Sequence, residues 1–261
     1  MTQVLLDSDG LPRLAAGSLS GSAGAAAGAA AGAAAALGGS FGPAAALGGA
    51  EASAGVKTGT TIVACCYAGG VVLGADSRTS AGPYVVNRAA RKITRLGERI
   101  CVCRSGSAAD TQALAQVARL QLQLYSQELP RHFKGAARVR VAAHLLQQLS
   151  YEYKDVLTAG LIVAGWDPVE GPQAFSIPIG GSCIPVQYTA GGSGSVFITA
   201  FLDEHFRPNM SKEEATQLVA KAVAHAIRRD GSSGGLIRIV TIEKDAMDEI
   251  CIKGDDLPGG A

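Results

Sequence analysis

The chain has 261 residues, of which 48% are hydrophobic, and its 23 Lys and Arg nearly balance its 22 Asp and Glu. A formal net charge of +1 gives no electrostatic reason for binding to nucleic acid or to a membrane surface. The opening MTQVLLDSDG lacks the basic start and apolar run of a signal peptide, and the Ala and Gly tracts near residues 25–36 are too short to span a bilayer. We therefore expect a soluble protein of the cytoplasm or nucleus.

The first 59 residues differ in composition from the rest. From about Ala15 to Gly55 the sequence is almost wholly Ala, Gly and Ser, which lack the large side chains needed to offset chain entropy. We expect residues 1–59 to be a disordered or loosely structured leader, and residues 60–261 to form one domain with its own core. Neutral low-complexity drift and a role in assembly or protection both explain such a leader, and composition does not separate them.

The cysteine pattern indicates thiols rather than disulfides or zinc. The sequence has no CxxC pair and no His at metal-ligand spacing beside a Cys. We expect reduced core thiols of a cytosolic protein, with Cys65 and Cys66 serving in packing. The six cysteines are Cys65, Cys66, Cys101, Cys103, Cys183 and Cys251.

The first half of the domain predicts two hairpins and then two helices. Apolar and β-branched residues flank Gly69-Gly70, which predicts a hairpin, and a second hairpin is expected with its turn around Gly97. Ser107 and the acid three residues later have capping-box spacing, ahead of a helical apolar pattern that runs to Pro130. A second helix, antiparallel to the first, is expected from about 139 to 155.

The second half repeats this order. Strands are expected at TAGLIVAGWD, AFSIPIG and CIPVQYTA, followed by a helix that ends near His205. Ser211 and Glu214 then predict a capped helix through Arg229, with final strands at LIRIVTIEK and EICIKG. Because each sheet needs cover on one face, this order predicts an α+β protein with a four-layer α-β-β-α sandwich.

A Gly-Thr-Thr sequence lies where the leader gives way to the domain. Cleavage of the Gly59–Thr60 bond would leave Thr60 with both a nucleophilic hydroxyl and a free α-amine that can act as base. Such a nucleophile also needs a nearby cation and a group to hold it. Lys92 and Asp76 are candidates, although each residue taken alone is better explained as an ordinary surface lysine and a turn-capping acid, respectively.

Several ordered motifs reduce this ambiguity. From Gly59 to residue 253 the chain closely resembles the catalytic beta subunits of the proteasome core particle, which are N-terminal nucleophile hydrolases. The motifs that carry the resemblance are TGTT, GGVVLGADSRTS, KIT, RSGSAADTQ, AGWDPVEG, GGSGS and RDGSSGG. Together they are highly specific.

The resemblance implies a role for each matching residue. Thr60 matches the nucleophile, Asp76 the acid, and Lys92 the lysine, which as an ammonium would favour deprotonation near Thr60 while Asp76 keeps it charged. Gly106 matches the backbone donor that faces the scissile carbonyl, a role compatible with a glycine that ends a strand. The remaining matches are Arg78, which follows the acid, and the group near the nucleophile's amine: Ser193, Asp230 and Ser233.

The resemblance also gives the leader a purpose. We expect Thr60 to attack the Gly59 carbonyl and water to hydrolyse the resulting ester, so that residues 1–59 are removed autocatalytically. Gly59 suits this step because it lacks a side chain and can adopt a tight turn. The proposed chemistry needs no metal or organic cofactor.

Arg104 matches the position that lines the pocket for the side chain before the scissile bond. A fixed cation there favours Asp or Glu and disfavours Lys or Arg, unless Arg104 is simply an exposed residue at a strand end. In the family this cation is typical of the caspase-like subunits; the trypsin-like, chymotrypsin-like and inducible immune siblings lack it. Thr79, Ala90 and Ala108 match further pocket positions.

The family implies an endopeptidase in a barrel of four seven-membered rings, acting on unfolded polypeptides in ATP- and ubiquitin-dependent degradation. The implied partners are neighbouring beta subunits, the alpha ring and, through it, a regulatory particle. A non-catalytic ring subunit is an alternative, but such siblings usually lack part of the catalytic set. A bacterial two-ring protease shares the nucleophile without the RSGSAADTQ and RDGSSGG context. The four histidines, at 132, 144, 205 and 225, match no catalytic position.

Overall fold

The computed structural model describes residues 5–6, 12–13, 59–128 and 137–253. The chain divides into two compact units, Met1–Ala54 and Gly55–Ala261. In the first unit, β1 (Leu5–Leu6) pairs antiparallel with β2 (Pro12–Arg13). The Ala and Gly tract of the leader, the expected helix end at Pro130 and His132 lie outside the described residues.

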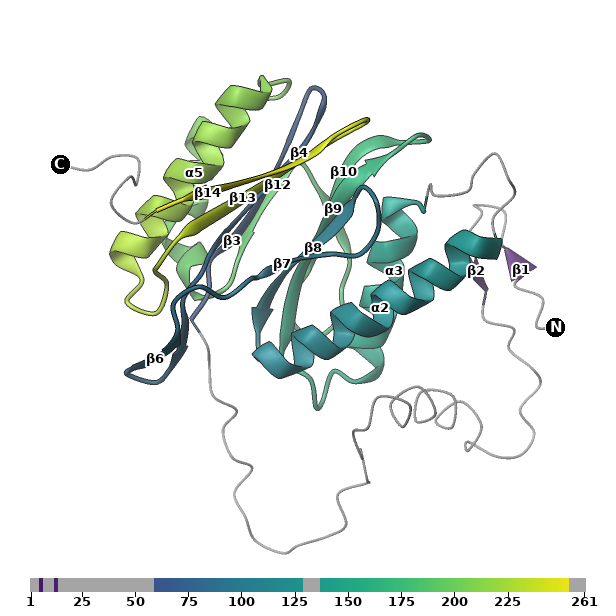
Figure 1. Ribbon diagram of the computed structural model, residues 1–261, viewed down its shortest axis with the longest axis horizontal. Coiled ribbons are helices and arrows are strands. Elements are labelled where there is room, and N and C mark those ends of the chain that lie inside the picture. Colours follow the sequence, from purple (N-terminus) through teal and green to yellow (C-terminus); the bar gives the residue numbers. More distant parts are fainter. Residues whose placement is uncertain (1–4, 7–11, 14–58, 129–136, 254–261) are drawn as a thin grey trace, which may run out of the picture. The chain divides into compact units, whose positions relative to one another are not determined.

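The second unit is built on two five-stranded antiparallel sheets (Figure 1). The first sheet has the order β12 (Tyr188–Gly191), β3 (Ile62–Tyr67), β4 (Gly70–Asp76), β13 (Ile237–Glu243) and β14 (Met247–Ile252). The second has the order β11 (Ile184–Val186), β10 (Gly171–Ile177), β9 (Ala159–Asp167), β8 (Ile100–Gly106) and β7 (Ile93–Arg95). Both predicted hairpins, β3–β4 and β7–β8, are confirmed.

Helices cover the outer face of each sheet, which confirms the α-β-β-α sandwich of the N-terminal nucleophile hydrolase fold (Figure 1). On the second sheet, α2 (Ala108–Glu128) packs on β8, and α3 (Val139–Glu152) packs on β9 and β10. On the first sheet, α5 (Lys212–Arg229) packs on β3, β4 and β13, and α4 (Thr199–His205) packs on β12. The short 3-10 helix η2 (Ser193–Phe197) leads into α4.

Strand β3 is buried on both faces because its side chains alternate between two apolar layers. Val63 and Cys65 join the cluster that includes Val223 of α5, whereas Ile62 and Ala64 join the cluster between the sheets. Every residue of β3 is buried. Thr60 and Thr61, just before β3, are therefore also buried.

One predicted strand is wrong. The segment CIPVQYTA forms two strands in different sheets, because β11 pairs with β10 whereas β12 pairs with β3. Both are edge strands, so the chain can step from one sheet to the other at Gln187. Pro185, which has no N–H to donate, lies in the edge strand where proline is tolerated.

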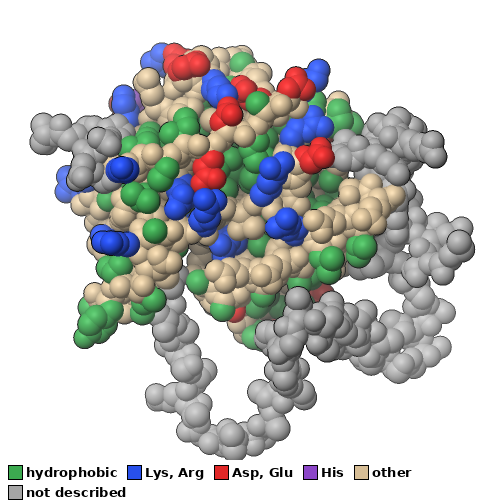
Figure 2. Space-filling model, viewed as in Figure 1, with side chains coloured by type: hydrophobic (Ala, Val, Ile, Leu, Met, Phe, Trp, Pro, Cys, Tyr) green, Lys and Arg blue, Asp and Glu red, His purple; other side chains and the backbone are tan. Residues whose placement is uncertain are grey.

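The structure contains a small hairpin that was not predicted. Strand β5 (Thr79–Ala81) pairs with β6 (Tyr84–Asn87) across a Gly-Pro turn in which Gly82 has a φ of 58°. Tyr84, Val85 and Val86 at its tip are 76%, 53% and 69% exposed. Figure 2 shows this hydrophobic tip at the lower left, and basic and acidic side chains together elsewhere on the same face.

The predicted helix starts are largely confirmed. Ser211 and Glu214 form the reciprocal capping box of α5. Ser107 accepts the N–H of Asp110 at 3.4 Å, whereas the Asp110 carboxylate accepts the N–H of Thr158 at 3.2 Å and so ties α2 to the approach of β9. No helix in the described ranges is long and apolar enough to cross a membrane.

The expectation that all six cysteines are core thiols is only partly right. Cys65, Cys66, Cys101 and Cys103 are buried, but Cys183 is half-buried and Cys251 is exposed. The exposed thiol lies on β14, the edge strand of the first sheet, where alternate side chains face away from the core. All six are free. Burial raises the pKa of Cys65 to about 11 and of Cys66 to about 12, so both stay protonated thiols at neutral pH, as packing residues would.

Candidate active site

The β3–β4 hairpin brings Thr60 and Asp76 together. In its register Ile62 lies opposite Ala75, so the residue before β3 faces the end of β4. The Thr61 N–H donates to Asp76 Oδ1 at 2.9 Å, and the Asp76 N–H donates to Thr61 O at 3.1 Å. Thr60 is 4% exposed and Asp76 is fully buried, which confirms that the acid reaches across the hairpin to the nucleophile's neighbourhood.

Lys92 lies just before β7, and its side chain reaches Asp76 and the Gly59 carbonyl. Its Nζ donates to Asp76 Oδ1 at 2.7 Å and to the Gly59 carbonyl oxygen at 3.0 Å. The Lys92 side chain is 8% exposed. Burial lowers the pKa of Lys92, and the Asp76 carboxylate opposes that effect by favouring the ammonium form. The surface-lysine alternative is therefore excluded.

Asp76 is a fully satisfied buried carboxylate. Its Oδ1 receives the two donors already described, and its Oδ2 accepts the N–H groups of Arg78 at 3.1 Å and Gly234 at 3.0 Å. The Arg78 guanidinium donates to the Gly231 carbonyl at 3.3 Å. Because a buried carboxylate costs much less when its oxygens are all hydrogen-bonded, these four donors stabilise Asp76 beside Lys92.

The Gly59–Thr60 bond lies at the centre of these contacts. Thr60 Oγ1 donates to the Gly59 carbonyl oxygen at 2.7 Å, so the hydroxyl and the Lys92 ammonium converge on one carbonyl. A Cβ added to Gly59 would collide with the backbone and Cβ of Ser232. Only glycine therefore fits at this position. The Gly59 N–H donates to Ser80 Oγ at 3.4 Å.

A second group of hydrogen bonds surrounds the Thr60 nitrogen. The Thr60 N–H donates to Ser193 Oγ at 3.0 Å, and Ser193 Oγ donates to Asp230 Oδ2 at 2.7 Å. Ser233 Oγ donates to the same Asp230 oxygen at 2.6 Å. Ser193 begins η2 and Asp230 ends α5, so residues distant in sequence meet at one nitrogen. The structure thus brings Ser193, Asp230 and Ser233 together.

Asp230 is held in its charged form. Burial alone would raise the pKa of its carboxyl, but hydrogen bonds from Ser233, Ser193 and the Ser232 N–H outweigh it and lower the pKa. An ionised carboxylate accepts hydrogen bonds only. Asp230 therefore fixes where the protons of its two serine neighbours point.

Arg104 is a constrained cation rather than a freely exposed one. Its Nε donates to Thr94 Oγ1 at 2.9 Å, and its two terminal nitrogens donate to Thr111 Oγ1 at 3.2 Å and to the Arg91 carbonyl at 2.6 Å. The residue is half-buried on β8, and burial lowers the pKa of its guanidinium. Because the ordinary pKa of arginine is far above neutral pH, the group stays charged. Thr94 and Thr111 were not predicted.

The other predicted pocket residues lie near the ends of elements. Thr79 begins β5 and is half-buried, Ala90 is half-buried and donates its N–H to Ser77 O at 2.9 Å, and Ala108 begins α2 and is exposed. No hydrogen bond described here joins these residues to Arg104, and their pocket role stays a prediction. Gly106 ends β8 opposite Ala159, with a φ of 101°, and its role as oxyanion donor likewise stays a prediction.

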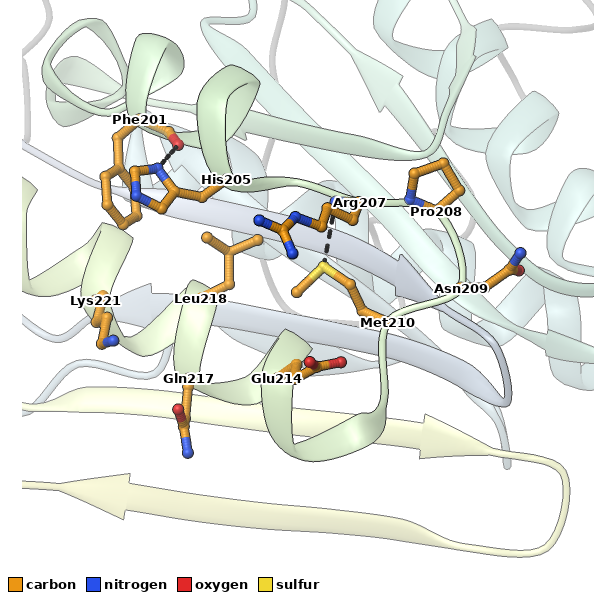
Figure 3. A pocket seen from close by; sticks show the side chains of 10 residues that line it. All are labelled: Phe201, His205, Arg207, Pro208, Asn209, Met210, Glu214, Gln217, Leu218 and Lys221. Carbon is orange, nitrogen blue, oxygen red and sulfur yellow. Dashed lines mark hydrogen bonds between the residues drawn. The ribbon is translucent and has the colours of Figure 1, made fainter.

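A separate groove of about 350 Å³ lies over α4, α5 and the loop between them (Figure 3). Its lining includes Phe201, His205 and Met210, and Figure 3 shows the His205 and Phe201 rings side by side. His205, like His144 and His225, is exposed. None of the predicted site residues lines this groove. In the described part of the chain, no group of three His, Cys, Asp or Glu could hold a metal ion.

Comparison with known proteins agrees with this geometry. A family model described as proteasome subunit matches residues 56–242. The chain belongs to the proteasome subunit family. It is 48% identical over 199 residues to proteasome subunit beta type-6 of Arabidopsis thaliana, an alignment that covers 76% of this chain and 84% of that protein.

Other relatives are also beta subunits. Over 201 residues the chain is 43% identical to proteasome subunit beta type-1 of Saccharomyces cerevisiae, covering 77% of this chain and 91% of that protein. Over 203 residues it is 47% identical to proteasome subunit beta type-9 of Oryzias latipes, covering 78% and 91%. The expected beta subunit of a eukaryotic proteasome core is confirmed.

Proposed function

We propose that this chain is a threonine endopeptidase subunit that activates itself by cutting the Gly59–Thr60 bond. One observation carries the proposal: the Thr60 hydroxyl and the Lys92 ammonium both contact the Gly59 carbonyl, at 2.7 and 3.0 Å. Nucleophile, cation and scissile bond are thus assembled in the uncut chain. Proximity of this kind can replace a large part of a reaction barrier.

The self-cleavage step balances as an N-to-O acyl shift followed by hydrolysis. Thr60 Oγ forms a bond to the Gly59 carbonyl carbon, the carbon–nitrogen bond breaks, and the hydroxyl proton ends on the Thr60 nitrogen. Water then cleaves the ester, which releases the Gly59 carboxyl group and restores the hydroxyl. Lys92 donates to the oxygen that gains negative charge in this step.

In the cut chain, the α-amine can act as the base. Its reference pKa is about 8, so a substantial neutral fraction can accept the hydroxyl proton directly or through a water. Ser193, which already accepts a hydrogen bond from this nitrogen, would orient the amine. Gly106 is the proposed oxyanion donor, and loss of such a donor typically costs about 3 to 4 kcal/mol.

For specificity we propose caspase-like cleavage after acidic residues. Overall identity does not distinguish the beta type-6 relative, at 48%, from the beta type-9 relative, at 47%. Arg104 supports the acidic preference, because three hydrogen bonds fix its guanidinium while donors remain for a carboxylate. Thr79, Ala90 and Ala108 are small enough to leave room for such a side chain.

The specificity proposal is tested by Arg104→Met in the assembled particle. We expect kcat/KM for peptides ending in Glu or Asp to fall about 10- to 100-fold, the cost of a lost charge-assisted bond. Cleavage after Leu should be maintained or improved. An unchanged preference for acidic peptides would show that the pocket assignment is wrong.

The proposed setting is a core of four stacked rings in the cytoplasm and nucleus, with beta and alpha subunits as neighbours and unfolded polypeptides as substrates. ATP- and ubiquitin-dependent delivery would come through a regulatory particle on the alpha ring. The exposed tip of the β5–β6 hairpin supports assembly, because three adjacent exposed apolar side chains are typical of a contact surface.

A non-catalytic ring subunit is the alternative function. The observed contacts favour catalysis, since Lys92, Asp76 and Thr60 form a complete and buried set. The test is peptidase activity of the assembled particle against acidic peptides with this chain as wild type, Thr60→Ser and Thr60→Ala. We expect loss of this activity in Thr60→Ala and partial activity in Thr60→Ser. Equal activity in all three would exclude the proposed function.

A further inference from the structure

Thr61 joins the two hydrogen-bonded groups that surround Thr60. Its backbone N–H and carbonyl both pair with Asp76, at 2.9 and 3.1 Å. Its side-chain oxygen lies 2.7 Å from Ser233 Oγ, on the other side of the nucleophile. Thr61 is fully buried, so water does not compete for either contact.

Proton counting gives the Thr61–Ser233 hydrogen bond a direction. Each hydroxyl has one proton to donate. Ser233 donates its proton to the Asp230 carboxylate at 2.6 Å, which leaves only a lone pair for Thr61. Thr61 Oγ1 is therefore the donor in the 2.7 Å contact with Ser233.

The same counting applies on the far side of Asp230. Ser193 Oγ lies 2.7 Å from Asp230 Oδ2 and 3.3 Å from the Thr60 carbonyl oxygen, so its one proton points to the carboxylate. Its lone pair is then directed at the Thr60 nitrogen, which donates to it at 3.0 Å. A continuous line of hydrogen bonds thus links Thr61 to the nitrogen of its own neighbour, and the donors on both sides converge on Asp230 Oδ2.

We propose that Thr61 is a positioning residue whose hydroxyl holds Ser233 in place and, through Ser233, holds the Asp230 carboxylate that orients Ser193 toward the Thr60 nitrogen. This inference rests on the proposed function of Thr60. Thr61 does not touch the reacting atoms through its side chain; it acts through Ser233 and Asp230. Without the Thr61 hydroxyl, the buried Ser233 oxygen has no hydrogen-bond donor. The Ser233 hydroxyl can then rotate away from Asp230.

The room left beside Thr61 supports a specific place for its hydroxyl. A Cβ added to Gly194 would collide with Thr61 Oγ1. The same Gly194 donates its N–H to the Thr60 carbonyl at 3.2 Å. The turn that holds the Thr60 backbone thus also makes space for the Thr61 hydroxyl, and this space requires glycine at position 194.

The test compares Thr61→Val, which keeps the shape and removes the donor, with Thr61→Ser, which keeps the donor. Each full chain is built into the assembled particle, and acidic-peptide kinetics follow confirmation that the chains begin at Thr60. We expect Thr61→Val to lose kcat about three- to tenfold, the rate equivalent of one hydrogen bond, with KM nearly unchanged. Thr61→Ser should recover most of that loss.

A double-mutant cycle separates this role from a general packing role. If Thr61 acts through Ser233, then adding Thr61→Val to Ser233→Ala should cause no further loss of kcat. Independent, multiplicative losses would overturn the proposal, as would full kcat in Thr61→Val or equal losses in Thr61→Val and Thr61→Ser. At the first turnover, a Thr61→Val chain should lose its leader more slowly than a Thr61→Ser chain.

If Thr61→Val does not assemble, Ser233→Ala is used instead, because it removes the other partner of the Thr61–Ser233 hydrogen bond. We expect a comparable loss of kcat with KM retained, and wild-type kcat in Ser233→Ala would overturn the proposal. The wild-type measurement distinguishes failure of the proposed function from failure of the positioning role. If wild-type particles show no Thr60-dependent cleavage, the proposed function fails; if they cleave and Thr61→Val cleaves equally well, only the positioning role fails.

Discussion

The two sides of Thr60 are built on different principles. On one side Lys92, just before β7, and Asp76, at the end of β4, form a charge pair with side chains 8% and 0% exposed. On the other side Ser193, Asp230 and Ser233 come from loops and helix ends and meet through hydroxyl hydrogen bonds. The first side supplies charge and the second supplies direction. The two sides should therefore fail differently when a residue is changed.

The largest effect is expected for Lys92→Met, which keeps the length of the side chain and removes its charge. Asp76 would be left ionised and buried without its cation, which typically costs about 3 to 5 kcal/mol of stability. We expect poor assembly of the chain, an uncut leader and no measurable acidic-peptide cleavage. Native gels and N-terminal mass analysis measure these outcomes.

The matched control is Lys92→Met with Asp76→Asn, which removes both charges. Assembly should recover in part, because no uncompensated charge is buried although the Asn NH2 group faces backbone N–H donors, but cleavage should stay absent. Recovery of activity in this double variant would show that the charge pair is structural, and the contrast between the two sides of Thr60 would be lost.

A smaller effect is expected on the directional side. Asp230→Asn keeps the size of the side chain but replaces an acceptor oxygen with an NH2 group, which conflicts with the protons of Ser193 and Ser233. We expect kcat to fall on the order of tenfold to a hundredfold, less than the full contribution of general base catalysis, with KM little changed. Steady-state kinetics on processed particles measure this, and a loss confined to KM would contradict it.

The pH dependence of kcat/KM should report on Lys92, the cation of the charge pair. Catalysis needs a neutral α-amine and a protonated Lys92, so kcat/KM should rise as the amine loses its proton and fall as Lys92 does. Because burial lowers the pKa of Lys92 from 10.5, the fall should begin below pH 10.5. A nearby carboxylate raises that pKa, so Asp230→Asn should move the fall to lower pH. An unshifted fall in Asp230→Asn would contradict the assigned electrostatics.

The smallest effect is expected for an ion pair at the surface. Arg140 and Glu170 lie 3.1 Å apart with side chains 45% and 33% exposed. Exposed pairs contribute about 0 to 1 kcal/mol, so Arg140→Ala should leave the melting temperature and cleavage rate of the particle close to wild type. A loss as large as that of Lys92→Met would mean that burial is not what distinguishes the two pairs.

The sequence predicted the charge side of the site better than the directional side. Alternating apolar residues around Gly69 and Gly97 predict two hairpins, and these place Asp76 and Lys92 at strand ends. Ser193 and Asp230 are distant in sequence and lie outside strands, so only the family motifs brought them together. Local patterns do not encode which loops meet in space.

Two misses have physical causes of this kind. Thr61 follows a threonine and precedes a buried strand, so it matches an ordinary β-branched strand residue, and its hydroxyl partner Ser233 lies 172 positions away. The step from β11 to β12 was missed because Gln187 interrupts neither the alternation nor the β propensity of its segment. The edge positions of both strands, which permit the step, are properties of the assembled sheets.

The central claim is that Thr60 cuts the bond that precedes it. N-terminal mass analysis of this chain, taken from assembled particles as wild type and as Thr60→Ala, tests that claim most directly. The account predicts a wild-type chain that begins at Thr60 and a Thr60→Ala chain that retains at least the residues adjoining Gly59. A wild-type chain that still begins at Met1, or a Thr60→Ala chain cut cleanly after Gly59, would contradict it.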